Sequence, residues 1–172
     1  MSSVRLTETS YIVLGLLEVC EPATPYDLKA LARQSTMHFW YVPHTQIYTE
    51  CGRLGEAGLL SETREQGGRR RRVYRLTDAG REALERWRSD PEARPAELRS
   101  PATLKMFFGA DPVALAAGQL DEHRRQLAEY ESIMGELEAS DGPPGWRRAL
   151  GLGIAQEREF IRFWERVADG DT

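Results

Sequence analysis

The stretch LLSETREQGGRRRRVYRLT, residues 59–77, holds two short segments of strand-like composition on either side of a Gly-Gly pair. In the second segment Tyr74 and Leu76 are two positions apart and therefore share one face of an extended strand. The two glycines favour a tight turn between the segments. These features predict a β-hairpin with four arginines at its tip and on its return strand: Arg69, Arg70, Arg71 and Arg72.

Three helices are predicted before this hairpin and one after it. The first covers 7–19, and the second begins at an N-cap, Thr24. The third opens with Pro43 in its first turn and ends near Gly58, a natural left-handed C-cap. Its buried stripe consists of Ile47, Cys51 and Leu54. The predicted fold is mainly α with a small β-hairpin, in the element order of a winged helix-turn-helix domain.

This domain type is suited to double-stranded DNA, because a helix fits the major groove and a basic hairpin can contact phosphates or the minor groove. A run of charge by itself more often marks a solvated face or an anionic-lipid patch. Here the glycines place mutually repelling arginines on an exposed tip, which favours a polyanionic partner. Lys29 and Arg53 are expected to add affinity. The expected base-reading residues are His44, Thr45, Gln46, Tyr48 and Thr49, with simple packing an equal alternative for the tyrosine.

The second half of the chain is predicted to be helical. Residues 91–103 are rich in proline and are expected to link a DNA-binding domain, 1–90, to a helical domain, 104–172. Two long helices in the second domain carry apolar residues at alternating spacings of 3 and 4. Such seams favour a partner helix, which predicts a homodimer. The expected interface residues are Leu120, His123, Leu127, Tyr130, Met134, Phe160 and Trp164.

Composition excludes several other classes of protein. The net charge is −4, but residues 1–90 carry 13 basic against 12 acidic side chains, whereas 91–172 carry 10 against 15. The chain has no motif of a phosphate-binding loop, hydrolase or metalloprotease, so it is not expected to be an enzyme. Cys20 and Cys51 have no metal-site spacing, so no metal, cofactor or disulfide is expected. The one apolar run near the N-terminus is too short to span a membrane, and a cytoplasmic protein is expected.

The first half resembles the N-terminal domain of the PadR family of bacterial transcriptional regulators. The matching segments are YIVLGLL at 11–17, YDLK at 26–29, QIY at 46–48, RLGEAGLL at 53–60 and RRVYRLTDAGREAL at 71–84. The segment RSPATLKMFFG at 99–109 is similar to the start of the C-terminal domain in the branch where that domain is larger. Pro25 replaces the usual glycine, and Gly52 and Gly55 interrupt the third helix.

The resemblance implies a dimeric repressor that binds an inverted-repeat promoter site with its third helix and wing. It implies that Tyr26 and Lys29 contact phosphate, and that a small aromatic or drug-like effector binds between the two domains. The residues expected to line an effector site are Trp87, Met106, Phe107, Phe108, Trp146, Phe160 and Trp164. Aromatic residues at helical spacing are more often core or interface, so that alternative stays open. A nucleoid-type, sequence-indifferent DNA binder without an effector is the other function that fits, and arginines turned toward an acidic protein are a third.

Overall fold

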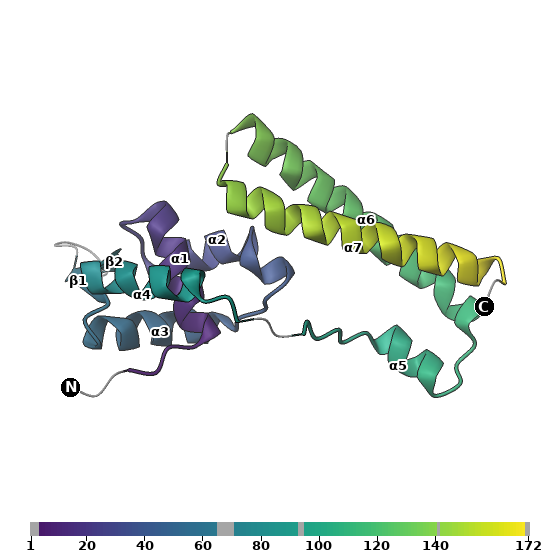
Figure 1. Cartoon of the computed structure of the whole chain (residues 1–172), viewed down its shortest axis with the longest axis horizontal. Helices are drawn as coiled ribbons and strands as arrows, with labels where there is room; N and C mark the ends of the chain where they lie inside the picture. The colour runs from purple at the N-terminus through teal and green to yellow at the C-terminus, as the bar shows by residue number, and fades with distance from the viewer. Residues whose placement is uncertain (1–3, 65–70, 93–94, 141, 171–172) are drawn as a thin grey trace. The chain divides into compact units, whose positions relative to one another are not determined.

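The computed structural model describes residues 4–64, 71–92, 95–140 and 142–170, and the chain divides into two compact units, Met1–Arg94 and Pro95–Thr172 (Figure 1). Unit 1 contains α1 (Glu8–Cys20), α2 (Pro25–Arg33), a 3₁₀ turn η1 (Thr36–His38), α3 (His44–Glu56), β1 (Leu60–Arg64), β2 (Arg72–Leu76) and α4 (Asp78–Ser89). Unit 2 contains α5 (Pro101–Phe107), α6 (Pro112–Ala139) and α7 (Pro144–Ala168). This order confirms the predicted winged helix-turn-helix followed by a helical region.

Capping side chains start the helices α2 and α4 of unit 1. At α2 the Thr24 hydroxyl accepts the backbone N–H of Asp27 at 3.3 Å, and the Asp27 carboxylate accepts the backbone N–H of Thr24 at 2.9 Å. At α4 the Thr77 hydroxyl accepts the backbone N–H of Gly80 at 3.1 Å. Gly80 is also required for close packing, because a Cβ there would lie well under 3.0 Å from the carbonyl oxygen of Leu59.

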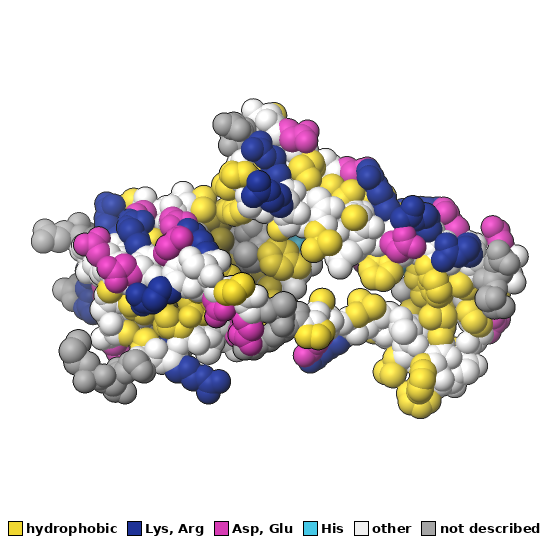
Figure 2. All heavy atoms as spheres, in the orientation of Figure 1, with side chains coloured by type: hydrophobic (Ala, Val, Ile, Leu, Met, Phe, Trp, Pro, Cys, Tyr) yellow, Lys and Arg dark blue, Asp and Glu magenta, His cyan; other side chains and the backbone are white. Residues whose placement is uncertain are grey.

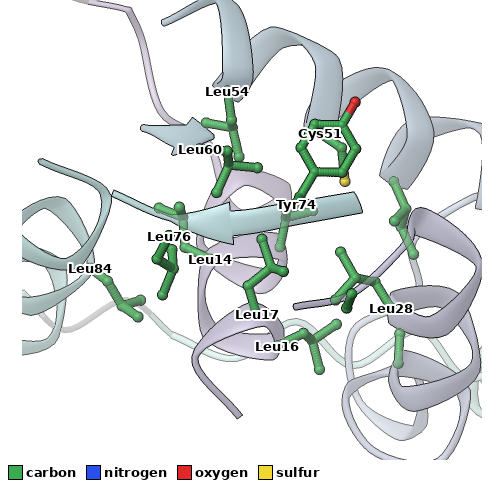
Figure 3. Close-up of a cluster of buried hydrophobic side chains, with 14 of the residues drawn as sticks. Leu14, Leu16, Leu17, Leu28, Cys51, Leu54, Leu60, Tyr74, Leu76 and Leu84 are labelled. Carbon is green, nitrogen blue, oxygen red and sulfur yellow. The ribbon is translucent and has the colours of Figure 1, made fainter. Parts of the chain in front are cut away.

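The core of unit 1 is built around α1, which packs against α2, α3, α4 and β2. Figure 3 shows leucines from these elements converging with Cys51 and Tyr74 on one cluster. Leu14 and Leu17 of α1 are completely buried there, and Tyr74 and Leu76 face the same cluster from β2. The prediction that Tyr74 and Leu76 share one face of the second strand is therefore confirmed. Each such side chain stabilises the fold by about 1.5–3 kcal/mol when fully buried.

The wing is an antiparallel pair of strands with Leu60 opposite Leu76 at its base and Arg64 opposite Arg72 toward its tip. Leu60 and Leu76 are buried, whereas all the residues of β1 after Leu60 are exposed. The pair therefore has one end seated on the core and the other directed to solvent. Arg64 and Arg72 lie at the solvent end.

The base of the wing is attached to the segment between α1 and α2. The backbone N–H of Ala23 donates to the Tyr74 carbonyl at 3.1 Å, and the Tyr74 N–H donates to the Ala23 carbonyl at 2.8 Å. The Glu21 carboxylate accepts the backbone N–H of Leu76 at 2.8 Å and forms an ion pair with Arg81. These bonds fix the direction in which the wing leaves the domain.

In unit 2 the helices α6 and α7 pack side by side as an antiparallel hairpin (Figure 1). Ion pairs cross the hairpin between Arg124 and Glu165 at 2.8 Å and between Glu131 and Arg158 at 2.8 Å. Inside the seam, His123 Nδ1 lies 2.7 Å from a carboxylate oxygen of Glu157. α5 begins at Pro101, inside the segment 91–103 that was expected to be a linker, because Ser100 caps it by accepting the backbone N–H of Thr103 at 3.2 Å.

The two apolar seams cover one another within a single chain. Tyr130 and Trp164 are buried, and the other expected interface residues are half-buried: Leu120, His123, Leu127, Met134 and Phe160. Tyr130 packs over Gly153 so closely that a Cβ at Gly153 would lie 3.0 Å from its ring. In a single chain α7 packs along α6 and buries part of these side chains. That the same residues form a homodimer interface stays a prediction.

Candidate nucleic-acid interface

The third helix of unit 1 presents a polar face to solvent. The five residues expected to read bases are all exposed on it: His44, Thr45, Gln46, Tyr48 and Thr49. The opposite face buries Ile47, Glu50, Cys51 and Leu54. Tyr48 is 48% exposed, so its ring is available for contacts outside the domain. The Thr49 hydroxyl donates to the Thr45 carbonyl at 3.0 Å, which leaves its oxygen lone pairs for a second partner.

Helix α2 lies against α3, as in a helix-turn-helix. Tyr26 is 66% exposed in its first turn, and Lys29 is half-buried one turn later. Because residues three apart lie on the same side of a helix, the two side chains form one edge of α2. A phenol and an ammonium group at that edge are both donors suited to phosphate oxygens.

The wing carries positive charge that is partly paired within the strands. Arg71 and Arg72 are exposed, and Arg69 and Arg70 lie outside the described residues. Glu62 stands among these cations, because its carboxylate accepts from Arg64 Nε at 3.0 Å and lies 3.6 Å from Arg72 Nε. The hydrogen bond from Arg64 and the nearby charge of Arg72 hold the pKa of Glu62 below its usual range. The carboxylate is therefore ionised and offsets part of the charge of the wing.

The wing carries two further exposed arginines, Arg64 and Arg75, which were not among the DNA-binding residues expected from the sequence. Arg64 lies directly opposite Arg72 in the strand register, and Arg75 is exposed opposite Ser61. Like charges placed opposite each other destabilise a strand pair, so Glu62 on the same face compensates them. The strand register is the feature that could have identified them. Pairing the two segments of the hairpin residue by residue places both arginines on the wing.

Arg53, which is expected to add affinity for DNA, makes several hydrogen bonds within the domain. Its Nε donates to Glu50 at 2.9 Å, its Nη1 to the carbonyl of Arg5 at 3.0 Å and its Nη2 to the hydroxyl of Ser10 at 2.9 Å. The side chain stays 31% exposed, and its contact with phosphate stays a prediction. Burial alone would raise the pKa of Glu50, but the hydrogen bonds from Arg53 and Ser10 outweigh burial and lower it. The pair is therefore an internal ion pair.

The aromatic residues expected at an effector site fall into two groups. Trp87 belongs to unit 1, where it stacks on Tyr11 with ring centroids 4.7 Å apart. The other six belong to unit 2. Trp164 is core, Phe160 stacks on His123 at 4.8 Å, and Met106 packs on the same cluster. Phe107 and Phe108 are 80% and 77% exposed, and Trp146 is half-buried near the start of α7.

Other classes of site find little support in the described residues. Within them, no three His, Cys, Asp or Glu side chains come together as ligands for a metal ion. None of the described helices is long and apolar enough to cross a lipid bilayer. Cys51 is buried, which raises the pKa of its thiol to about 12, and it is therefore a core residue and no nucleophile.

Comparison with known proteins agrees with this geometry. The model of the transcriptional regulator PadR-like family matches residues 13–86, and the model of the virulence activator alpha C-terminal domain matches 98–169. Over 171 residues the chain is 29% identical to the negative transcriptional regulator PadR of Bacillus subtilis strain 168, which covers 91% of this chain and 93% of that protein.

Solved structures show the same fold over nearly the whole chain. B. subtilis PadR in complex with operator DNA has a TM-score of 0.85 at 22% identity, covering 98% of this chain and 100% of that one. The same protein in complex with p-coumaric acid has a TM-score of 0.77 at 22% identity, and the match covers 95% of this chain and 97% of that one. The virulence activator AphA of Vibrio cholerae has a TM-score of 0.71 at 26% identity, and the match covers 95% of this chain and 97% of that one.

The two family models correspond to the two units of the structure. The first model falls within unit 1, and the second falls within unit 2. A winged helix-turn-helix with an exposed polar α3 is the part that a DNA-binding regulator requires. The match also agrees with the expectation that the chain is not an enzyme. The chain therefore belongs to the PadR-like family of DNA-binding transcriptional regulators and carries a C-terminal domain of the virulence activator alpha type.

Proposed function

We propose that the protein is a cytoplasmic, homodimeric repressor that binds an inverted-repeat site in a promoter and responds to a small aromatic molecule. The observation that carries this proposal is the polar face of α3, which is fully uncovered and belongs to the same unit as the arginines of the wing. B. subtilis PadR, a negative regulator with the same fold, is a precedent for operator binding.

In the proposed complex α3 lies in the major groove. Gln46 can form a bidentate pair with adenine, and the hydroxyls of Thr45 and Thr49 can serve either base edge. Arg71 and Arg72 meet phosphates beside the groove and release counterions as they do so, which makes binding dependent on salt. Two copies related by a twofold axis would place their half-sites about 10 base pairs, or a multiple of this, apart.

The test is a gel-shift titration with the DNA upstream of the protein's own gene, at two salt concentrations and with random DNA as competitor. Binding that survives the competitor supports a specific regulator, whereas binding that random DNA abolishes favours the sequence-indifferent binder. Replacement of Arg71 and Arg72 by alanine should weaken binding to all sequences and reduce the salt slope by about 0.9 per lost phosphate contact. Arg86→Ala on α4, 71% exposed at its side chain, is the matched control.

Dimerisation is supported by the exposed face of α5, beside the half-buried residues expected at the interface on α6 and α7. Leu104, Phe107 and Phe108 lie open to solvent at this helix and its C-cap, and Figure 2 shows hydrophobic side chains projecting from the region of α5. Contiguous exposed apolar groups of this kind mark protein interfaces. Sedimentation equilibrium should find a dimer, and serine at Phe107 and Phe108 should shift it to monomer. Leu152→Ser, at another exposed leucine, should leave the dimer intact.

An aromatic effector is supported by the relative that has been solved with p-coumaric acid and by the aromatic content of unit 2 in this chain. Met106, Trp146 and Phe160 are the half-buried residues of the expected set. p-Coumaric acid is therefore the first probe. It should change the tryptophan fluorescence and the DNA affinity of the protein over the same concentration range. No change in either quantity would remove phenolic acids of this kind from the proposal.

A further inference from the structure

The recognition helix α3 carries a carboxylate on its buried face. Glu50 is 8% exposed, and it is the one charged side chain that the described part of the chain buries. A buried charge costs free energy unless it is fully paired, and a hydrophobic residue in its place is often neutral or stabilising. A role in core packing alone therefore does not explain an acid at this position.

The partners of Glu50 form a closed network. Ser10 donates its hydroxyl to Glu50 Oε1 at 2.5 Å, while Arg53 donates Nη2 to Oε1 at 2.5 Å and Nε to Oε2 at 2.9 Å. The Ser10 oxygen also accepts the backbone N–H of Thr7 at 2.8 Å. Arg53 Nη1 extends the network to the Arg5 carbonyl at 3.0 Å. We name the three central residues, Ser10, Glu50 and Arg53, the clamp.

The clamp and its bond to Arg5 connect two parts of the domain that lie far apart in sequence. Ser10 is completely buried in the first turn of α1, Arg5 lies in the segment before α1, and the other two residues belong to α3. Around it the buried residues of α1 and α3 are mostly apolar, and the hydrophobic effect has no preferred direction. Charge-assisted, bidentate hydrogen bonds are directional. The clamp is thus the part of this contact that fixes the rotation of α3 about its own axis.

We infer that Ser10, Glu50 and Arg53 are positioning residues for DNA recognition, which set the rotation of α3 and so the placement of its base-reading face. Glu50 lies one turn after Gln46 on the same helix, next to Thr49. Helix side chains extend about 5–6 Å from the axis, so a rotation of ~10° moves their tips by ~1 Å. Hydrogen bonds to base edges weaken steeply with such a displacement. Phosphate contacts from flexible arginines do not depend on the exact rotation of α3.

This inference rests on the proposed reading of DNA by α3, and it makes a prediction that a phosphate-contacting Arg53 does not. Loss of the clamp should reduce the preference for operator over random DNA and leave the salt slope unchanged. Loss of a phosphate contact would instead lower the slope by about 0.9 and weaken all sequences alike. The two roles are therefore separable in a single set of titrations.

The experiment compares the full chain with Glu50→Gln, Ser10→Ala and Ile47→Val, using operator and random duplexes at several salt concentrations. Ile47 is completely buried on the same helix and is not one of the hydrogen-bonding residues of the clamp, so Ile47→Val is the control for a general loss of stability. Glu50→Gln should lose operator affinity by about tenfold or more, the value of one good base contact, and bind random DNA within about twofold of wild type. Ser10→Ala should act in the same direction and be non-additive with Glu50→Gln.

Three results would overturn the inference. If Glu50→Gln keeps the operator preference of wild type, the clamp does not position α3. If Ile47→Val loses as much preference as Glu50→Gln at equal stability, the effect belongs to folding. If Arg53→Gln, which removes the charge, lowers the salt slope, Arg53 contacts phosphate. If the wild-type protein itself shows no preference for the operator, the proposed function is refuted together with the inference. If the wild type shows the preference and Glu50→Gln keeps it, only the inference is refuted.

Discussion

Glu62→Gln measures how much of the positive charge of the wing is held back from DNA. The Glu62 carboxylate accepts from Arg64 Nε at 3.0 Å and from the Tyr74 hydroxyl at 3.2 Å, and it lies 3.6 Å from Arg72 Nε. Glutamine keeps the shape of the side chain and removes its charge. Arg64 and Arg72 then lose their anionic partner while the strands keep their register.

The expected magnitude follows from these two arginines. Each guanidinium that gains a phosphate contact should steepen the salt slope by about 0.9, so the slope should increase by ~0.9 if one arginine is released and by ~1.8 if both are. A change of 0.9 alone corresponds to about eightfold tighter binding per tenfold reduction in salt. Because the released contacts go to the backbone, random and operator DNA should gain equally, and the specificity ratio should stay constant.

Fluorescence anisotropy with both duplexes between about 0.05 and 0.3 M salt gives the two slopes. Glu82→Gln on α4 is the matched control, since Glu82 pairs with Arg86 at 3.6 Å on a helix surface outside the wing. It should leave both slopes at the wild-type value. If Glu62→Gln also leaves them unchanged, the Glu62 carboxylate does not hold Arg64 or Arg72 back from phosphate, and the reasoning is refuted.

Three further predictions concern the fold of unit 1. Gly80→Ala should lower the free energy of unfolding by about 1–3 kcal/mol, because the added methyl group would overpack against the Leu59 carbonyl. Gly52→Ala should raise the free energy of unfolding by about 0.5–1 kcal/mol, because nothing lies near the added Cβ. Chemical denaturation measures both changes. The lowered pKa of Glu50 contributes stability that is present above its unfolded pKa, about 4.3, and is lost as pH falls through the folded pKa. The stability gap between wild type and Glu50→Gln should therefore shrink in acid, and a constant gap from pH 7 to pH 3 would contradict the ion pair. With a thiol pKa of about 12, Cys51 should resist alkylation at pH 8 until the domain unfolds, and rapid labelling of native protein would show that the core is open.

Local features of unit 1 could be predicted from the sequence because each depends on neighbouring residues. The caps at Thr24 and Thr77 use side chains within three residues of the backbone groups they bind. The hairpin follows from strand composition, a Gly-Gly turn and the alternation around Tyr74. The exposed face of α3 follows from the helical period once its buried stripe is recognised. The family resemblance fixed the order in which these parts combine.

The partner of each surface could not be predicted in this way. The seam of α6 was expected to bind a second chain, and the structure shows that α7 of the same chain packs along it; a heptad pattern looks the same in both cases. Arg53 was expected to add affinity for DNA, which stays a prediction. The structure pairs it with Glu50, and only the approach of α1 to α3 brings Ser10 to the same carboxylate.

The sequence by itself thus determined the elements of this protein, their order and the polar and basic character of the surfaces that a regulator needs. These properties follow from hydrogen bonds and side-chain periodicities within a few residues along the chain. The tertiary structure alone decided which charges are free for DNA and which are used inside the domain. Ser10 and Glu50 are 40 residues apart, and no local rule specifies a contact over that separation. It arises because burial of the apolar faces brings α1 against α3 and leaves their polar groups to pair with each other.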